Sequence, residues 1–187
     1  ESREVIMSKK IVVITGSPRK GGNSIAMTKA FIEAAKERGH SITRFDATYL
    51  NIDGCNACET CLKNGKACSF DDDFNSIAPA ILEADTVIYT MPVYWYSIPA
   101  KIKAVIDKMF PFCMDHENVT GKGCGLICCC AEDDMSVMDG VRIPIERTAA
   151  LLQWHMVGEV LITGVQNEGD IEKTDGCRQA AALAEKI

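Results

Sequence analysis

The sequence predicts an α/β fold in which a five-stranded parallel sheet carries helices on both faces. Five short apolar runs have the length and β-branched content of buried strands, and segments with apolar residues at helical spacing separate them. Strands that alternate with helices in this way are typical of a parallel sheet in one α/β domain. The strands are expected at residues 10–17, 41–47, 85–94, 123–131 and 157–165, and the helices at 24–38, 71–84, 97–110, 141–156 and 177–187.

The helical segments differ in how clearly their ends are marked. The first carries Ile25, Phe31 and Ala35 at helical spacing and is followed by Gly39, a residue that suits a helix C-terminus. The second starts with acidic residues, which favour a helix N-terminus, but Pro79 predicts a helix that is short, kinked or late-starting. The fourth strand contains three consecutive cysteines, 128–130, which act as small hydrophobic residues in an apolar run.

Length and composition indicate an ordinary globular domain, with 187 residues, 47% hydrophobic and 25% charged. We expect the domain to span residues 7–187, with residues 1–6 as an N-terminal extension or a cloning remnant. The net charge of −6 argues against a nucleic-acid binder, and no apolar run approaches the ~18 residues that cross a membrane. There is no apolar signal segment, and the ten cysteines lack the pattern of a secreted disulfide protein, which together predict a cytoplasmic location.

The loop after the first predicted strand reads "GSPRKGGNS" and covers residues 16–24. It lacks the G-x-G-x-x-G of dinucleotide sites and the Lys-Ser/Thr pair of a Walker A loop. Small residues that open a helix and carry Ser17, Arg19, Asn23 and Ser24 suit a monophosphate dianion, because backbone N–H groups at a helix N-terminus attract anions. The alternative is an ordinary turn in which a serine or asparagine caps the helix.

This loop and the segment "MPVYWYSIPAKIKAVIDKM" together resemble the flavodoxin-like NAD(P)H-dependent FMN reductases, which include the iron–sulfur flavoproteins. The resemblance covers nearly the whole chain from Lys10 and implies a flavodoxin-like three-layer sandwich; for such a sheet the expected strand order is 2-1-3-4-5. It also implies that the four polar residues of the first loop hold the FMN phosphate. The residues implied at the ribityl chain and the flavin ring are Pro92, Val93, Tyr94, Trp95 and Tyr96, with Cys130 and Ala131 after the fourth strand. The alternative for the three aromatic residues is a place in the core or in a subunit contact.

Four cysteines, Cys55, Cys58, Cys61 and Cys68, lie within fourteen residues after the second predicted strand. Zinc sites usually take two separated C-x-x-C knuckles, whereas the compact spacing C-x₂-C-x₂-C-x₆-C suits a [4Fe–4S] cluster better. The iron–sulfur flavoproteins that the chain resembles carry a compact cysteine motif at this place. Zinc binding, a redox pair and purely structural thiols remain as alternatives.

These observations predict an FMN-dependent oxidoreductase that moves electrons from NAD(P)H, or from reduced ferredoxin, to a quinone, a flavin or another small acceptor. The chemistry is centred on the flavin, and the cysteine loop is a candidate iron–sulfur carrier of single electrons. One alternative is a flavodoxin-like electron carrier without a small-molecule substrate, and another is a redox- or metal-responsive scaffold. The resemblance further implies a homodimer or homotetramer.

Overall fold

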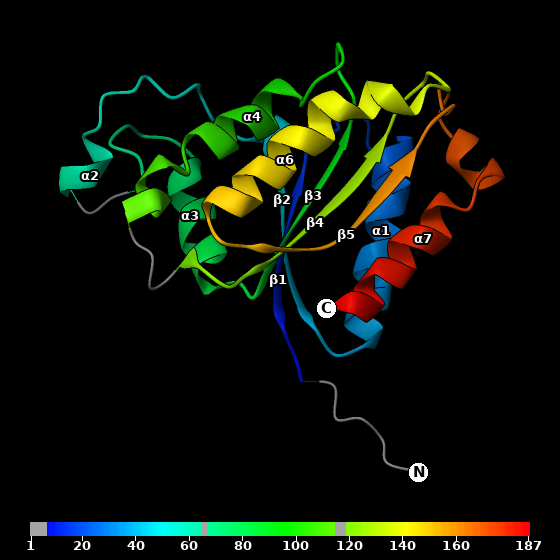
Figure 1. Ribbon diagram of the computed structural model, residues 1–187, viewed down its shortest axis with the longest axis horizontal. Coiled ribbons are helices and arrows are strands. Elements are labelled where there is room, and N and C mark those ends of the chain that lie inside the picture. The colour runs from blue at the N-terminus through cyan, green and yellow to red at the C-terminus, as the bar shows by residue number, and fades with distance from the viewer. Residues whose placement is uncertain (1–6, 65–66, 115–118) are drawn as a thin grey trace.

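A computed structural model describes residues 7–64, 67–114 and 119–187 of the chain (Figure 1). Residues 1–6, predicted as an extension, lie outside the described residues. Five strands form one parallel sheet in the order β2-β1-β3-β4-β5, which confirms the predicted fold and strand order. The strands are β1 (Lys10–Thr15), β2 (Ser41–Asp46), β3 (Thr86–Pro92), β4 (Gly123–Cys129) and β5 (His155–Ile162).

Helices cover both faces of this sheet. Helices α1 and α7 lie on one face, and α3, α4 and α6 lie on the other (Figure 1). The helices are α1 (Asn23–Glu37), α2 (Cys61–Asn64), α3 (Phe74–Glu83), α4 (Ala100–Asp107), α6 (Asp139–Leu151) and α7 (Gly176–Leu183). Short 3₁₀ turns are η1 (Ala47–Tyr49), η2 (Phe110–Met114), η3 (Met135–Met138), η4 (Asp170–Lys173) and η5 (Ala184–Lys186). Within the described residues, no helix has the length and apolar character needed to cross a membrane.

The strand sequences are apolar on both sides because each central strand is covered on both faces. In β1, Ile11 and Val13 pack in the core beneath α1 and α7, whereas Val12 and Ile14 pack in the core beneath the other helices. The strands β3 and β4 are buried almost throughout, while the edge strand β2 is largely half-buried or exposed. The predicted small-hydrophobe role of Cys128–Cys130 is confirmed, since all three are buried.

Several observed elements are shorter than the expected ranges, and two regions bear on the predictions above. Pro79 was predicted to make this helix short, kinked or late-starting; α3 is short, with 10 residues, but it starts before the proline and continues through it to Glu83. The fifth strand starts at His155, so the expected helix over 141–156 was too long at its C-terminal end and the strand expected at 157–165 began too late. The reason is local: Gln153 takes a left-handed φ of 56°, which stops the helix, and the Trp154 indole is buried with its N–H donated to the Val119 carbonyl oxygen.

Candidate functional site

The loops that follow β1, β3, β4 and β5 meet at the carboxyl edge of the sheet and form two adjoining cavities of about 240 and 490 Å³. The two cavities share Val93, Tyr94, Cys130 and Ala131. All eleven residues predicted to bind the cofactor line one cavity or the other. The smaller is lined by Ser17, Arg19, Asn23, Ser24 and Pro92, and the larger by Trp95 and Tyr96, in addition to the shared residues.

The smaller cavity has the character of an anion site, because the first turn of α1 opens into it. The residue before the helix, Gly22, offers no side-chain cap, and the first turn carries no acidic side chain. The first helical hydrogen bond runs from the Ala26 N–H to the Gly22 carbonyl oxygen at 3.0 Å, so the N–H groups of the preceding turn have no helical acceptor. A Cβ at Gly22 would lie 3.2 Å from the Arg19 carbonyl oxygen, which explains the small residue here. Uncapped N–H groups at a helix N-terminus suit a phosphate.

The side chain of Asn23 forms hydrogen bonds with the segment after β5, which the sequence did not indicate. Its amide nitrogen donates to the carbonyl oxygens of Val165 and Asn167, and its amide oxygen accepts from the Ile171 N–H. The asparagine therefore ties the segment after β5 to the start of α1. In this arrangement Asn23 can offer its backbone N–H to an anion, while its amide holds the neighbouring loop.

The loop after β5 adds three cavity residues that the sequence analysis missed: Val165, Gln166 and Glu168. The carboxylate of Glu168 lies over the loop of residues 16–24, since a Cβ at Gly21 would fall 1.9 Å from its Oε1. One general signal could have found these residues. The carboxyl ends of parallel strands share one edge, so the loop after the fifth strand belongs there as much as the loop after the first.

The aromatic residues after β3 form a tight turn. Tyr94 and Ser97 exchange both backbone hydrogen bonds at 3.0 Å, and the two residues between them, Trp95 and Tyr96, have left-handed φ values of 46° and 60°. Such a turn favours glycine or asparagine, so two aromatic residues here store strain of about 1–3 kcal/mol each. Strain of this kind clusters at binding sites. The turn holds Trp95 outward, with 94% of its surface exposed.

Two neighbours support the turn. The backbone of Gly140 in α6 lies against it so closely that a Cβ would fall 1.6 Å from the Tyr96 carbonyl oxygen. A hydrogen bond to the Glu132 carboxylate raises the pKa of the Tyr96 hydroxyl, which links the turn to the loop after β4. The aromatic turn that forms this cavity wall is thus supported by α6 and by the loop after β4.

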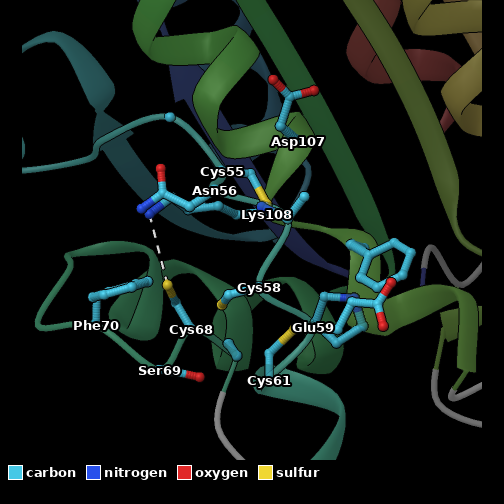
Figure 2. Close-up of a pocket in the computed structure, with 15 residues that line it drawn as sticks. Cys55, Asn56, Cys58, Glu59, Cys61, Cys68, Ser69, Phe70, Asp107 and Lys108 are labelled. Carbon is cyan, nitrogen blue, oxygen red and sulfur yellow. Dashed lines mark hydrogen bonds between the residues drawn. The ribbon is translucent and has the colours of Figure 1, made fainter.

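A separate cavity of about 340 Å³ is lined by all four predicted ligand cysteines, Cys55, Cys58, Cys61 and Cys68 (Figure 2). Ala57 and Glu59, on either side of Cys58, have left-handed φ values of 52° and 55°. The Ala57 N–H donates to the sulfur of Cys55 at 3.5 Å. This backbone path places the first two thiols at the surface, where they are exposed.

The thiols of this loop differ in acidity. Hydrogen bonds from the backbone and the hydroxyl of Thr60 lower the pKa of Cys58. Burial, and then the neighbouring thiols of Cys58 and Cys55, raise the pKa of Cys61. Cys58 is therefore the more readily ionised of the two. This matters for a metal site, because the thiolate is the form that binds metal.

A buried ion pair holds the base of the cysteine loop. The Lys108 ammonium lies 2.5 Å from the Asp72 carboxylate, with only 5% and 4% of the two side chains exposed. Lys108 also reaches the sulfur of Cys68 at 3.7 Å, the contact drawn as a dashed line in Figure 2. Burial alone would raise the pKa of Asp72, but hydrogen bonds from Lys108 and from the N–H groups of Phe74 and Asp53 bring the pKa below its usual value.

The donor set of this cavity fits an iron–sulfur cluster, since four thiols face one space and two of them are exposed. The four thiols are not gathered around one point, however. Among the described residues, no three His, Cys, Asp or Glu side chains lie close enough together to hold a metal ion. A bound cluster would require the loop to draw its thiols together.

The family model for NADPH-dependent FMN reductase matches residues 9–139. The chain belongs to this family. The match includes the loop after β1, the aromatic turn and the loop after β4, which line most of the two cavities at the sheet edge, but not the loop after β5.

Several curated relatives carry the name iron–sulfur flavoprotein. The chain is 37% identical to the one from Methanosarcina thermophila over 99 residues, and 35% identical to one from Archaeoglobus fulgidus over 103 residues. These matches cover 53% and 55% of this chain and 51% and 46% of the relatives, so the chain spans about half the length of the curated relatives it matches.

Solved structures confirm the fold. An azoreductase from Bacillus anthracis superimposes with a TM-score of 0.73 at 18% identity, covering 97% of this chain and 100% of that one. An FMN-dependent NADH-azoreductase from the same species, solved in complex with FMN, superimposes with a TM-score of 0.71 at 14% identity, covering 95% and 98%.

Proposed function

We propose that the protein is an FMN-dependent oxidoreductase that passes electrons from NAD(P)H, or from reduced ferredoxin, to a quinone, a flavin or another small acceptor. One observation carries the proposal. An uncapped helix N-terminus opens into a cavity that adjoins a second one walled by aromatic residues, at the carboxyl edge of the sheet. Family membership supports it, and so does the likeness in fold to an azoreductase that binds FMN.

In this proposal the smaller cavity holds the FMN phosphate. The first-turn N–H groups of α1 and the hydroxyls of Ser17 and Ser24 bind its oxygens, and Arg19 at the rim adds positive charge. The segment Pro92–Val93 and the residues Cys130 and Ala131 line the ribityl chain and one side of the ring. When bound, FMN supplies the ability to accept two electrons and to release them singly.

The aromatic turn orients the ring and restricts access to it. Tyr94, Trp95 and Tyr96 offer flat apolar surfaces, and backbone groups of a rigid turn can hydrogen-bond the polar edge of a flavin. The contacts of the turn with Gly140 and Glu132 hold these surfaces in place before the flavin arrives. The wide exposure of Trp95 also supports a homodimer or homotetramer in which a second copy covers this residue, which sedimentation would test.

The decisive experiment combines an absorbance spectrum with steady-state turnover. Purified protein with added FMN is expected to retain the flavin on gel filtration and to oxidise NAD(P)H continuously with a quinone or free flavin as acceptor. Rapid reduction by ferredoxin without NAD(P)H turnover and without onward electron transfer to a quinone or free flavin would favour the electron-carrier alternative instead. Failure to retain FMN would contradict both.

The four-cysteine cavity supports a second candidate function, an iron–sulfur cluster held by Cys55, Cys58, Cys61 and Cys68. The supporting observations are the shared cavity, the N–H group donated to the sulfur of Cys55, and the name of the archaeal relatives. Iron and sulfide analysis of anaerobically purified protein tests it. About four irons per chain would support the cluster, and flavin without iron would eliminate it.

A further inference from the structure

A carboxylate lies in the lining of the cavity assigned to the FMN phosphate. It belongs to Glu168, the one acidic residue among the described residues that line this cavity. Arg19 lines the same cavity, but within residues 7–64, 67–114 and 119–187 neither Arg19 nor Glu168 forms an ion pair. A negative charge beside a phosphate opposes binding, because like charges repel. The binding of the FMN phosphate therefore does not explain Glu168.

Glu168 is held at the tip of a tight turn. The turn runs from Asn167 to Asp170 and is closed by a hydrogen bond from the Asp170 N–H to the Asn167 carbonyl oxygen at 3.1 Å. Gly169 has a φ of 86° and a ψ of −8°, the left-handed conformation that the third position of a type II turn requires. Glu168 takes the second position, so its side chain leaves a defined backbone.

Further hydrogen bonds fix this turn against the start of α1. The Asn23 amide nitrogen donates to the Asn167 carbonyl oxygen at 2.8 Å, and the Asn23 amide oxygen accepts from the Ile171 N–H at 3.3 Å. The Asp170 carboxylate accepts from the Asn167 N–H at 2.7 Å. The backbone on both sides of Glu168 is thus tied down, and the same asparagine that opens α1 sets its position.

The Glu168 side chain spans the space between the loop after β5 and the loop after β1. A Cβ on Gly21 would lie 1.9 Å from Oε1 of Glu168 and 2.7 Å from its Cδ, so the carboxylate rests directly on the Gly21 backbone. The next two residues, Gly22 and Asn23, line the phosphate cavity. The cavity is therefore bordered here by a charged side chain, and a ligand that continued past its phosphate in this direction would have to displace the carboxylate.

The two common flavin nucleotides differ at this end of the molecule. FMN ends at a phosphate monoester, whereas in FAD the same phosphate carries a second phosphate and an adenosine. The cavity has a volume of only about 240 Å³. A carboxylate at its border leaves room for the monoester but opposes a second phosphate by its volume and by its charge. Repulsive elements of this kind give binding sites their specificity.

We propose that Glu168 is a specificity-determining residue, which makes this site accept FMN and reject FAD. The proposal rests on the proposed function, since it requires the FMN phosphate to bind beside the start of α1. Glu168 lies outside residues 9–139, the part of the chain that the family model matches. The assignment comes from the contact between the turn after β5 and Gly21 in this chain.

The test is a fluorescence titration of the full chain with FMN, with FAD and with riboflavin, which has no phosphate. Two variants separate the charge of the side chain from its volume. Glu168→Gln removes the charge and keeps the size, and Glu168→Ala removes both. The matched control is Glu172→Ala, which removes an exposed carboxylate on the η4 turn that follows, outside the lining that the described residues give this cavity.

We expect the wild type to bind FMN at least about a hundredfold more tightly than FAD. Glu168→Ala should narrow this ratio by about tenfold, and Glu168→Gln by about threefold, because the amide still fills the space. The Glu172→Ala control should keep the ratio of the wild type, and riboflavin should bind equally to all four proteins. An unchanged ratio in Glu168→Ala would overturn the proposal, and so would a wild type that binds FAD as tightly as FMN.

The outcomes separate this proposal from the proposed function. Tight FMN binding with a ratio that no substitution of Glu168 changes would overturn the specificity role and leave the flavin site standing. A Glu168→Ala variant that gains FAD binding, from a wild type that retains FMN but does not oxidise NAD(P)H, would support the specificity role and contradict the enzyme. A chain that retains neither flavin would contradict both.

Discussion

The sheet-edge cavities and the cysteine cavity are built in different ways. The first two lie at the ends of four paired strands, and their anion-binding groups are backbone N–H groups whose direction follows from β1 and α1. The cysteine cavity lies along the segment between β2 and α3, whose described residues form only the η1 turn and the one-turn helix α2, and long side chains hold this segment in place. Lys101 donates to the carbonyl oxygens of Leu50 and Ile52, and Lys108 pairs with Asp72. A site on a sheet edge is formed before its ligand binds, whereas a site on a loop depends on a few polar contacts and on the ligand itself.

The largest expected effect comes from removing the ammonium group that holds the cysteine loop. In Lys108→Met the buried carboxylate of Asp72 loses its partner, which costs about 3–5 kcal/mol of unfolding free energy. Urea denaturation measures this loss. The double variant with Asp72→Asn is expected to recover part of it, because it removes the unpaired charge.

Helix α4, which ends directly before Lys108, supplies a matched control for this substitution. Lys103 and Asp107 also lie 2.5 Å apart, but 51% and 41% of their side chains are exposed. Lys103→Met should therefore cost no more than about 0.5 kcal/mol. Equal losses in Lys103→Met and Lys108→Met would show that burial of the Asp72 pair does not anchor the loop.

A second prediction concerns the anion site. Ser17→Asp places a carboxylate in the cavity assigned to the phosphate, and repulsion between like charges should weaken FMN binding on the order of a hundredfold. Fluorescence titration with FMN measures the change. Ser41→Asp, at the opposite end of the sheet where β2 begins, is the control and should leave FMN affinity as it is. Unchanged affinity in Ser17→Asp would place the phosphate elsewhere.

The contact of Gly140 with the aromatic turn gives a third prediction. Alanine normally stabilises a helix relative to glycine, but here the added Cβ would collide with the Tyr96 carbonyl oxygen. Overpacking should prevail, so Gly140→Ala is expected to cost about 1–3 kcal/mol of stability and to weaken FMN binding together with it. The control is Gly54→Ala in the cysteine loop, where a Cβ meets nothing within 4 Å. A stable Gly140→Ala variant with normal FMN affinity would show that the turn can move freely.

The smallest expected effect lies away from both sites, on the edge strand β5. Burial, and then the nearby carboxylate of Glu146, raise the pKa of Glu159, and its Oε1 is a buried oxygen without a hydrogen-bond partner among the described residues. Because the folded state binds this proton more tightly than the unfolded state, the wild type loses stability as the pH rises through the raised pKa. Glu159→Gln should therefore be more stable than the wild type at pH 8, by about 1 kcal/mol, with the gain vanishing toward pH 4.

Thermal denaturation across this pH range measures the difference. The comparison is the same substitution at an exposed carboxylate, Glu83→Gln, which should change the free energy of unfolding at pH 8 by no more than about 0.5 kcal/mol. A Glu159→Gln variant that is less stable than the wild type at pH 8 would show that the carboxylate is stabilised rather than strained.

Much of the sheet edge could be predicted from the sequence, because its signals are local. Apolar runs locate the strands, and the small-residue loop after the first strand marks an anion site. A general rule then brings the loops together at one edge. The strand order was predicted correctly, and the structure places all eleven predicted cofactor residues around the two adjoining cavities.

The contacts that complete these sites could not be predicted, because they join residues far apart in the chain. The amide of Asn23 meets the segment after β5, Lys108 meets Asp72, and Gly140 meets Tyr96. No periodic pattern in the sequence indicates such pairs. The cysteine spacing likewise predicted four candidate ligands without indicating that their thiols would lie apart in the described structure.

The central claim is that the sheet edge forms the flavin site without help from the cysteine loop. Equilibrium titration of FMN against the wild type and against the variant with Cys55, Cys58, Cys61 and Cys68 all changed to serine tests it most directly. We predict dissociation constants that agree within about twofold, because none of the four cysteines lines either cavity at the sheet edge. Loss of FMN binding in the folded serine variant would contradict the account.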